Sequence, residues 1–330
     1  MAGVGQPGRM TPGGPQPAPL GLADIEAAAE RIAGRVRRTP LIDAMPLKDA
    51  PAPGALRLKL ECLQVTGSFK PRGATNKLLS LDEAQVSRGI ITASGGNHGL
   101  AVAYAARQAA TRAVIYLPTS TPAAKAAKLA AWGAEVRFEG GVWDKANEAA
   151  LAAAECEGLT YLHPFADPAV IAGQGTVGLE ILDDAPETGL LLVAIGGGGL
   201  ISGIATAAKA LKPSIRVVGV EPTGAPTLKE SLAAGQLVTL PAIETEAGTL
   251  APRRSAEINL ELIARHVDEI VLVSDEEMRA AARWLWFELG IAAELSGAAA
   301  LAALKADRVE TAPGTPVTAL VCGAGTDGLS

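Results

Sequence analysis

Hydrophobic positions along the chain switch between two spacings, and this switching predicts a regular series of strands and helices. Between residues 89 and 156, short runs rich in Val, Ile and Leu alternate with stretches whose apolar residues recur every three to four positions. Strands that alternate with helices in this way are typical of a parallel sheet. The predicted elements of this part are strand 90–93, helix 97–110, strand 113–117, helix 122–132, strand 134–138 and helix 143–156.

The same pattern continues in the rest of the chain and predicts an α/β fold. Near-continuous Val, Ile and Leu strands are expected in parallel-rich sheets that helices cover on both faces. A helix is also predicted for residues 22–32, ahead of the first strand. The further predicted elements are strand 56–60, a helix from 73, helix 170–182, strand 190–195, helix 200–211, strand 216–220, strand 269–273, helices 276–289 and 294–304, and strand 317–321.

The length of 330 residues is sufficient for two lobes, each with its own core. We predict a small, mobile α/β domain at residues 89–162 and a large domain made of residues 21–88 and 163–330. Half of residues 1–20 are Gly or Pro, which predicts a disordered N-terminal extension and no signal peptide.

Composition and charge narrow the class of protein. Hydrophobic residues make up 48% of the chain, charged residues 19%, and the net charge is -6, which gives no support to nucleic-acid binding. The three cysteines, Cys62, Cys156 and Cys322, are widely spaced, as free thiols in a reducing cytosol are. No stretch approaches the roughly 18 consecutive apolar residues of a membrane-spanning helix. We therefore expect a cytoplasmic protein with no nucleic-acid or membrane partner.

One lysine stands at the junction of a predicted strand and a predicted helix. Lys70 lies in the stretch 66–74 (TGSFKPRGA), and Pro71 behind it is a residue type that begins helices. An amine at such a boundary, beside an aromatic ring, can be desolvated and become nucleophilic, as Schiff-base chemistry requires. A lysine at a helix start is also an ordinary solvated residue, and this stretch alone leaves both interpretations open.

A first glycine-rich loop, residues 94–99 (SGGNHG), follows strand 90–93 and begins a helix. Its glycines allow close backbone approach, and a helix N-terminus offers free N–H groups to a carboxylate. An ordinary strand-to-helix turn has the same composition, and by itself the loop is better explained that way.

A second loop, residues 196–199, consists of four consecutive glycines after strand 190–195. Such a run is costly in chain entropy and indicates a cradle of backbone N–H groups for a phosphate. A Gly-x-Gly-x-x-Gly dinucleotide motif does not fit, because its third glycine would fall on Ile201 or Ser202. The phosphate of a small cofactor is therefore favoured.

These stretches, together with residues 220–222 (VEP), 296–299 (SGAA) and 322–323 (CG), resemble the motifs of the fold-type II pyridoxal-phosphate enzymes in order and spacing. Within them, the chain is most similar to the serine/threonine dehydratase and serine racemase branch. The resemblance runs from about residue 22 to the last few residues. It implies a two-lobed α/β fold like that of the tryptophan synthase β subunit, an active site between the lobes, pyridoxal 5'-phosphate as cofactor and a homodimer.

The resemblance also implies roles for individual residues. Lys70 would hold the cofactor and then remove the Cα proton of the substrate as general base. Phe69 would pack against the cofactor ring, and Asn97 would hydrogen-bond the oxygen of its hydroxyl. The residues implied in binding the substrate carboxylate are Ser94, Gly95, Asn97 and His98.

The phosphate would lie on Gly196, Gly197, Gly198 and Gly199. Cys322 matches the position whose side chain hydrogen-bonds the pyridine nitrogen. A neutral partner there would leave that nitrogen unprotonated and favour elimination over reactions that need a long-lived carbanion. Cysteine is also a common buried structural residue, so that interpretation remains open.

Two departures from the family pattern narrow the expected function. The racemases carry a serine, their second base, where this chain has Gly95, so racemisation is disfavoured. Some members bind a divalent cation through a glutamate, a carbonyl and an acidic residue. Glu221 and Ala225 fit the first two positions, but Thr227 occupies the acidic one, so we assign no metal site and leave Glu221 and Ala225 as possible ligands.

We therefore expect β-elimination of a 3-hydroxy amino acid, such as L-threonine or L-serine, to a 2-oxo acid and ammonia. The alternatives are an amino-acid racemase or β-replacement enzyme of the same fold, or a protein that only binds the cofactor or an amino acid. The few residues after Cys322 leave no room for a C-terminal regulatory domain. Arg253 and Arg254, where the family often has a loop near the substrate, hint at an anionic substrate side chain or form a solvated surface.

Overall fold

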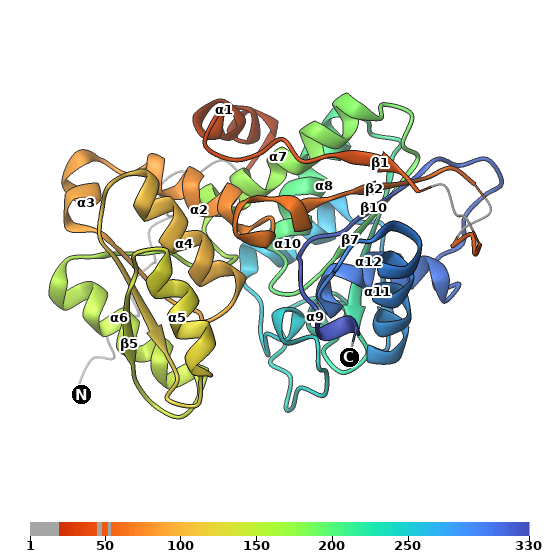
Figure 1. The fold of residues 1–330 in the computed structure, drawn as a ribbon. Coiled ribbons are helices and arrows are strands. Elements are labelled where there is room, and N and C mark those ends of the chain that lie inside the picture. The colour runs from red at the N-terminus through yellow and green to blue at the C-terminus, as the bar shows by residue number, and fades with distance from the viewer. Residues whose placement is uncertain (1–19, 45–47, 52–53, 330) are drawn as a thin grey trace, which may run out of the picture.

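The computed structural model describes residues 20–44, 48–51 and 54–329. The predicted N-terminal extension, residues 1–20, lies outside the described part except for Leu20. Two sheets organise the fold, one on each side of the molecule in Figure 1.

The larger sheet has six strands in the order β1-β2-β10-β7-β8-β9. All neighbouring strands are parallel except β1, which pairs with β2 in the antiparallel direction. Strands β7 and β10 in its middle are buried at every position, which agrees with their unbroken apolar sequences. The strands are β1 (Leu41–Asp43), β2 (Leu56–Lys59), β7 (Leu190–Ala194), β8 (Arg216–Pro222), β9 (Glu269–Val273) and β10 (Val317–Leu320).

The smaller sheet has four parallel strands in the order β5-β4-β3-β6. It contains β3 (Ile90–Ala93), β4 (Ala113–Leu117), β5 (Glu135–Phe138) and β6 (Thr160–Tyr161). The helices that accompany it are α3 (Glu83–Arg88), α4 (Asn97–Gln108), α5 (Ala123–Ala131) and α6 (Trp143–Glu157).

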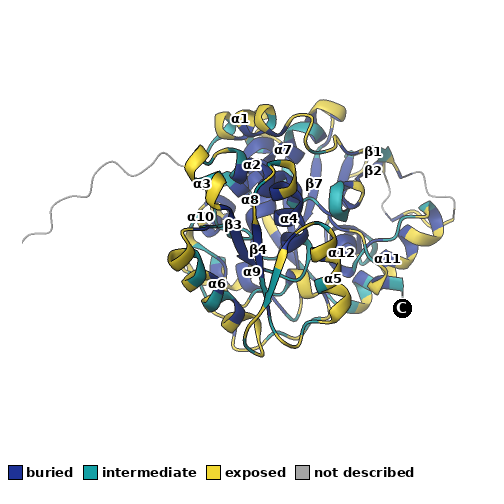
Figure 2. Ribbon diagram, turned by 60° about the vertical axis from the view of Figure 1, so that its left-hand side comes forward, coloured by how far each residue is buried: buried dark blue, intermediate teal, exposed yellow. Residues whose placement is uncertain are grey.

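The remaining helices accompany the six-stranded sheet. Helix α2 lies beside α7 between the two sheets (Figure 1), and both carry long buried faces (Figure 2). These helices are α1 (Leu22–Ile32), α2 (Lys70–Leu79), α7 (Pro168–Asp184), α8 (Gly199–Leu211), α9 (Thr227–Ala234), α10 (Glu257–His266), α11 (Asp275–Leu289) and α12 (Leu295–Lys305).

The predicted α/β fold class is confirmed, and most predicted elements are present within a few residues of the expected bounds. Helix α1 and strand β9 have the predicted bounds, whereas α2 begins at Lys70, three residues earlier than expected. The strands and α-helices that the sequence did not predict are β1, β6, α3, α9 and α10. The predicted domain boundaries themselves stay a prediction.

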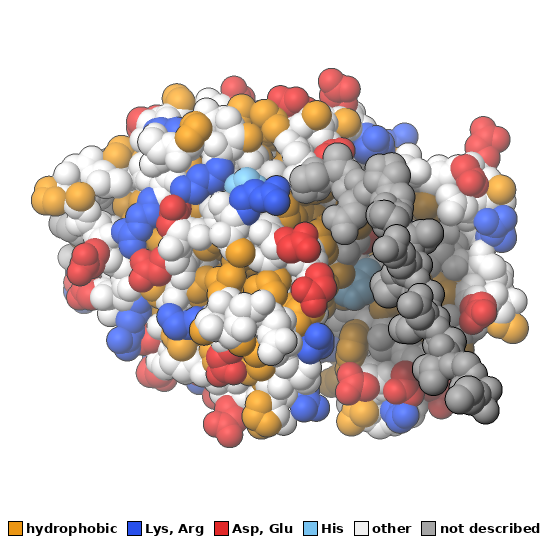
Figure 3. Space-filling model, turned by 180° about the vertical axis from the view of Figure 1, so that it is seen from behind, with side chains coloured by type: hydrophobic (Ala, Val, Ile, Leu, Met, Phe, Trp, Pro, Cys, Tyr) orange, Lys and Arg blue, Asp and Glu red, His pale blue; other side chains and the backbone are white. Residues whose placement is uncertain are grey.

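The surface agrees with the acidic, mixed composition. On the face seen in Figure 3, Lys and Arg side chains are interspersed with Asp and Glu, without a continuous basic stripe over the visible residues. Among the described helices, none has the length and apolar character needed to cross a membrane.

Candidate active site

The stretch before α2 brings Lys70 next to the end of β10. Thr66 adopts a left-handed conformation at φ 65°, which turns the chain back toward the sheet. Ser68 then forms an antiparallel bridge with Gly323, and the Phe69 N–H donates to the Cys322 carbonyl at 3.3 Å. Two segments that lie about 250 residues apart in the sequence are thereby paired immediately before the lysine.

The Lys70 amine is directed toward the chain that follows the smaller sheet. Its Nζ donates to the Pro164 carbonyl at 2.8 Å and lies 5.0 Å from the centroid of the Phe69 ring. Burial lowers the pKa of Lys70 to about 8, although electrostatic interactions with Cys322 and Glu294 oppose this shift. The amine is therefore far closer to its neutral, nucleophilic form than an exposed lysine.

Asn97 reaches the same region from the smaller sheet. It is the first residue of α4, after the glycine-rich loop at the end of β3. Its Nδ2 donates to Glu294 Oε1 at 2.8 Å, and the Thr249 hydroxyl lies 3.5 Å from the same oxygen. Burial raises the pKa of Glu294, which influences Lys70 electrostatically.

Two histidines stay neutral beside the lysine. The buried His98 ring donates from Nε2 to the Leu162 carbonyl at 3.0 Å, and its Nδ1 has no partner among the described residues. Burial, assisted by the charge of Lys70, lowers the pKa of His98 to about 3. The same two causes lower the pKa of His163 to about 4, and its Nδ1 accepts from the N–H groups of Phe165 and Ala166.

The four glycines connect β7 to α8 in a space that excludes larger residues. A Cβ on any of them would lie only 2.2 to 2.8 Å from a neighbouring atom, and at Gly197 those neighbours are Phe165 ring carbons. Gly198 has φ +93°, which residues with a side chain rarely adopt. Asn259 Nδ2 and Ser255 Oγ both donate to the Gly197 carbonyl, each at 2.8 Å, and so fix the loop from α10 and the residues before it.

This loop fits the phosphate of pyridoxal phosphate. Helix α8 begins at Gly199, so the N–H groups of its first turn have no acceptor within the helix and point outward at the positive end of the helix dipole. In the same turn, the buried Ser202 hydroxyl has no partner among the described residues. The loop thus offers donors of the kind that a phosphate accepts.

Cys322 is suited to be the neutral partner of the pyridine nitrogen. Its thiol is buried and donates to the Ser296 carbonyl at 3.4 Å. Burial, assisted by the charge of Glu294, raises the pKa of Cys322 well above its ordinary value, so the thiol keeps its proton.

Glu221 and Ala225, the possible cation ligands, make no contact with Lys70 among those described above. Both carboxylate oxygens of the buried Glu221 accept from the first turn of α9, from the N–H groups of Leu228 at 2.8 Å and Lys229 at 2.9 Å. Burial raises the pKa of Glu221 to about 7 against the effect of these two bonds. Thr227 donates to the Pro252 carbonyl at 2.7 Å. In the described part of the chain, no three His, Cys, Asp or Glu side chains are grouped so that they could hold a metal ion.

The structure therefore brings Lys70, Phe69 and Cys322 together directly, Asn97 through Glu294, and the glycine loop through Phe165. It does not connect Glu221 and Ala225 with this group through any contact described above. The sequence did not single out Pro164, Phe165 or Asn259, although the first two follow the carboxyl end of β6, where ligand-binding residues are expected.

Proteins of known name are similar to this chain over most of its length. The L-threonine ammonia-lyase of Thermotoga maritima is 40% identical over 283 residues, which cover 86% of this chain and 70% of the relative. The serine racemase of Oryza sativa subsp. indica is 38% identical over 87% of this chain and 84% of its own.

Solved structures of similar proteins also match most of this chain. Maize serine racemase matches with a TM-score of 0.87 and 36% identity, over 92% of this chain and 93% of that one. The processed threonine deaminase isoform 2 of Solanum lycopersicum has a TM-score of 0.86 and 34% identity, over 92% and 83% of the two chains. The family model described as "Pyridoxal-phosphate dependent enzyme" matches residues 32–323. The chain belongs to the family of pyridoxal-phosphate-dependent enzymes.

Proposed function

We propose that this protein is an ammonia-lyase that converts a 3-hydroxy amino acid, such as L-threonine or L-serine, to a 2-oxo acid and ammonia by β-elimination. The observation that carries the proposal is the partly buried Lys70 amine with its lowered pKa, held between the chain after β6 and the end of β10. Relatives named L-threonine ammonia-lyase are 40% identical over 86% and 90% of this chain.

Lys70 would hold the cofactor through its amine and afterwards take up the proton from Cα of the substrate at Nζ. When bound, pyridoxal phosphate supplies the electron sink for that step. The Pro164 carbonyl, 2.8 Å from Nζ, orients the amine when it carries a proton. The hydroxyl group then leaves Cβ as water, and a double bond forms between Cα and Cβ. The released enamine tautomerises to an imine, which water hydrolyses to the 2-oxo acid and ammonia.

The other predicted residues would bind and orient. The loop residues Ser94 and Gly95, with Asn97 and His98 in the first turn of α4, would hold the substrate carboxylate at the positive end of the helix dipole. The loop 196–199 would hold the phosphate.

The ring of the cofactor would lie between three side chains. Phe69 would pack on it, Asn97 would bond its hydroxyl oxygen, and Cys322 would face its nitrogen. Because the Cys322 thiol keeps its proton, it places no negative charge at that nitrogen. This supports elimination over reactions that need a more strongly activated ring.

The loop with the two arginines supports a neutral substrate side chain. Arg253 Nε donates to the Leu240 carbonyl at 2.9 Å, and Arg254 Nη1 donates to the Leu237 carbonyl at 3.2 Å. Both residues are exposed, and their guanidinium groups hold the adjacent loop. Threonine or serine is therefore favoured over an acidic 3-hydroxy amino acid.

Racemisation is the second candidate, because serine racemases are among the relatives with 38% identity. A racemase needs an acid or base on the second face of the substrate. Position 95 is glycine, which has no side chain to serve as that acid or base. This supports elimination as the main reaction.

We further propose a cytoplasmic homodimer in which the small domain, residues 89–162, closes over the substrate and excludes water. The three free cysteines fit a reducing compartment. Trp286 and Phe287 on α11 are 54% and 73% exposed, which supports a face covered by a second copy. Light scattering of the wild type and of Phe287→Glu tests the dimer.

The test of the reaction is an assay of ammonia and 2-oxo acid with a panel of 3-hydroxy amino acids, with Lys70→Ala as the inactive variant. Lys125→Ala, which changes an exposed lysine, is the matched control. We expect a visible cofactor band that borohydride bleaches in the wild type and in the control but that is missing in Lys70→Ala. A band without elimination, but with exchange of the α-proton, would favour the racemase. No band with added cofactor would refute the proposal.

A further inference from the structure

Two residues after Lys70, the guanidinium of Arg72 is fully buried in a network of charges. Its Nε and Nη2 donate to the two carboxylate oxygens of Glu61, each at 2.8 Å. Its Nη1 and Nη2 also donate to the two oxygens of Glu180, at 2.7 and 2.9 Å. Lys59 donates to the same Glu180 at 2.6 Å, so this carboxylate joins two cations.

Arg72 therefore forms a bidentate pair with Glu61 on one side and with Glu180 on the other. Glu61 follows β2, whereas Glu180 lies in α7, so the guanidinium ties the first turn of α2 to both. A bidentate pair fixes direction as well as distance, because the planar group must lie in line with each carboxylate. The Thr176 hydroxyl accepts a further bond from Nη1 at 3.1 Å.

The side chains of Lys70 and Arg72 point to opposite sides of α2. At about 100° per residue, they are separated by about 200° around the helix axis. The arginine lies on the α7 side, while the lysine is directed toward Pro164. Any rotation of the first turn that loosened the arginine would thus displace the amine.

Close backbone contact between α2 and α7 opposes such a rotation. A Cβ on Gly73 would lie 2.7 Å from the Val170 carbonyl, and one on Gly173 would lie 2.6 Å from the Arg72 carbonyl. The backbones are in direct contact directly beside the network. The orientation of the first turn is therefore set where Arg72 bonds Glu180.

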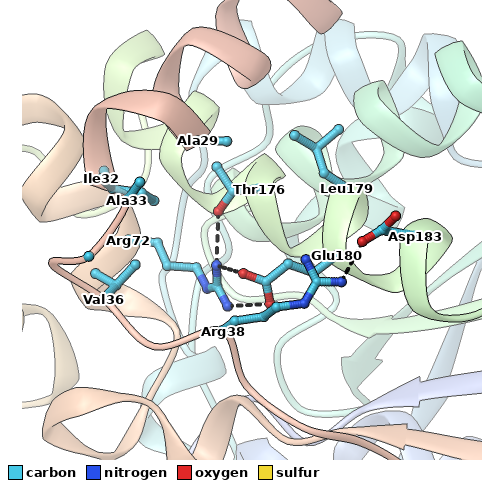
Figure 4. A pocket seen from close by; sticks show the side chains of 11 residues that line it. Ala29, Ile32, Ala33, Val36, Arg38, Arg72, Thr176, Leu179, Glu180 and Asp183 are labelled. Atoms are coloured by element: carbon cyan, nitrogen blue, oxygen red, sulfur yellow. Dashed lines mark hydrogen bonds and ion pairs between the residues drawn. The ribbon is translucent and has the colours of Figure 1, made fainter.

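A need for stability alone does not explain this network. Replacing a buried ion pair by apolar residues is often neutral or stabilising, so such a pair is weak evidence of a purely stabilising role. Arg72, Thr176 and Glu180 line a cavity of about 540 Å³. Figure 4 shows these side chains together with apolar residues such as Ile32 and Leu179. The charges lie in partly apolar surroundings, where directional bonds are the feature that apolar side chains could not supply.

We propose that Arg72 is a positioning residue for Lys70: its two bidentate bonds, to Glu61 and Glu180, fix the rotation of the first turn of α2 and so the direction of the lysine amine. For the catalysed reaction, this inference rests on the proposed function. For cofactor capture, it rests on the family alone.

The test compares Arg72→Lys with Lys77→Met. Lysine keeps the charge of Arg72 but cannot form either fork. Lys77→Met breaks the Lys77–Asp167 ion pair, 2.8 Å long, which joins the same two helices farther from the amine. Each variant is measured for melting temperature, for the rate at which the cofactor-stripped protein captures pyridoxal phosphate, and for kcat and KM.

We expect Arg72→Lys to slow cofactor capture and to lower kcat, each by about tenfold or more, with little change in KM, because the misdirected amine acts in both steps. Lys77→Met should lower the melting temperature without changing either rate. If Arg72→Lys changes only the melting temperature, the network is merely structural and the proposal is wrong.

A milder variant covers the case in which Arg72→Lys does not fold. Thr176→Val keeps the shape of the side chain and removes one acceptor from Arg72, so we expect a smaller loss of capture rate in the same direction. An unchanged capture rate in a folded Thr176→Val would overturn the proposal. If the wild type captures the cofactor but eliminates no substrate, the proposed function fails, while the capture rates still test Arg72.

Discussion

Replacing Lys70 by methionine should make the cofactor-free protein more stable at neutral pH. The folded protein holds the lysine amine where burial lowers its pKa from 10.5 to about 8. The unfolded chain therefore binds a proton more readily than the folded protein between pH 8 and 10.5. In that window the stability contributed by this group rises with pH, and below it the folded state carries the full penalty of a buried ammonium.

The size of the effect follows from the two pKa values. The fall from 10.5 to about 8 corresponds to a penalty of about 3 kcal/mol at pH 7, at 1.36 kcal/mol for each factor of ten. Methionine removes this penalty but also the bond to the Pro164 carbonyl, which contributes about 1 kcal/mol. The expected gain is about 2 kcal/mol at pH 7, and it falls below about 1 kcal/mol at pH 9.5, where most Lys70 amines in the folded protein are already neutral.

Urea unfolding of the stripped wild type and of Lys70→Met at both pH values measures this gain. Lys125→Met is the control, because this lysine is exposed and its replacement should give the same small difference at both pH values. A gain for Lys70→Met that does not change between pH 7 and 9.5 would refute the reasoning, since it would have no connection with the proton of the amine.

Three further predictions concern the neighbours of the amine. Glu294→Gln keeps an acceptor for Asn97 but removes a charge that raises the pKa of Lys70. The pH profile of cofactor capture should therefore move to lower pH. An unmoved profile would contradict this effect of the Glu294 charge. Gly197→Ala places a Cβ 2.2 Å from Phe165 ring carbons and should weaken cofactor binding about tenfold or more. The double variant with Phe165→Ala should recover part of the affinity, and spectrophotometric titration measures both variants. Absence of recovery would exclude the clash with Phe165 as the cause. Asn259→Leu removes one of the two side-chain bonds to the Gly197 carbonyl and the bond to the Phe165 carbonyl, and should raise the dissociation constant of the cofactor about tenfold. This effect should exceed that of Ser255→Ala, which removes one bond. Equal, small effects of both would show that the loop keeps its shape without these bonds.

The sequence predicted the strands of both sheets well where their burial leaves an unbroken apolar run. Strand β9 and helix α1 were predicted with their observed bounds. Apart from α10, the missed strands and α-helices have eight residues or fewer. Strands β1 and β6 have three and two residues, too few for a period to show, and α9 follows Pro226 and ends before Gly235 within eight residues.

The candidate site was predictable where the chemistry depends on residue type at a strand end. Lys70 and the loop 196–199 are of that kind, because an amine or a run of glycines is visible in the sequence. The Pro164 carbonyl is not, since every residue carries a carbonyl and only the fold decides which one faces the amine. Glu294 was visible before a helix of small residues, but its bond to Asn97 depends on the packing of two sheets against each other.

The first turn of α2 thus combines two charged residues whose removal should change stability in opposite directions. Lys70 is a cation with one carbonyl bond, in surroundings that lower its pKa, so its loss relieves the folded state. Arg72 is a buried cation bonded on both sides, so its loss leaves Glu61 without a cation and Glu180 with Lys59 alone, and should cost about 3 to 5 kcal/mol. A reactive amine must stay poorly solvated, and it keeps one direction only if a neighbouring group holds its helix in place. The two substitutions, made two residues apart, should therefore change the free energy of unfolding with opposite signs, as this division of roles requires.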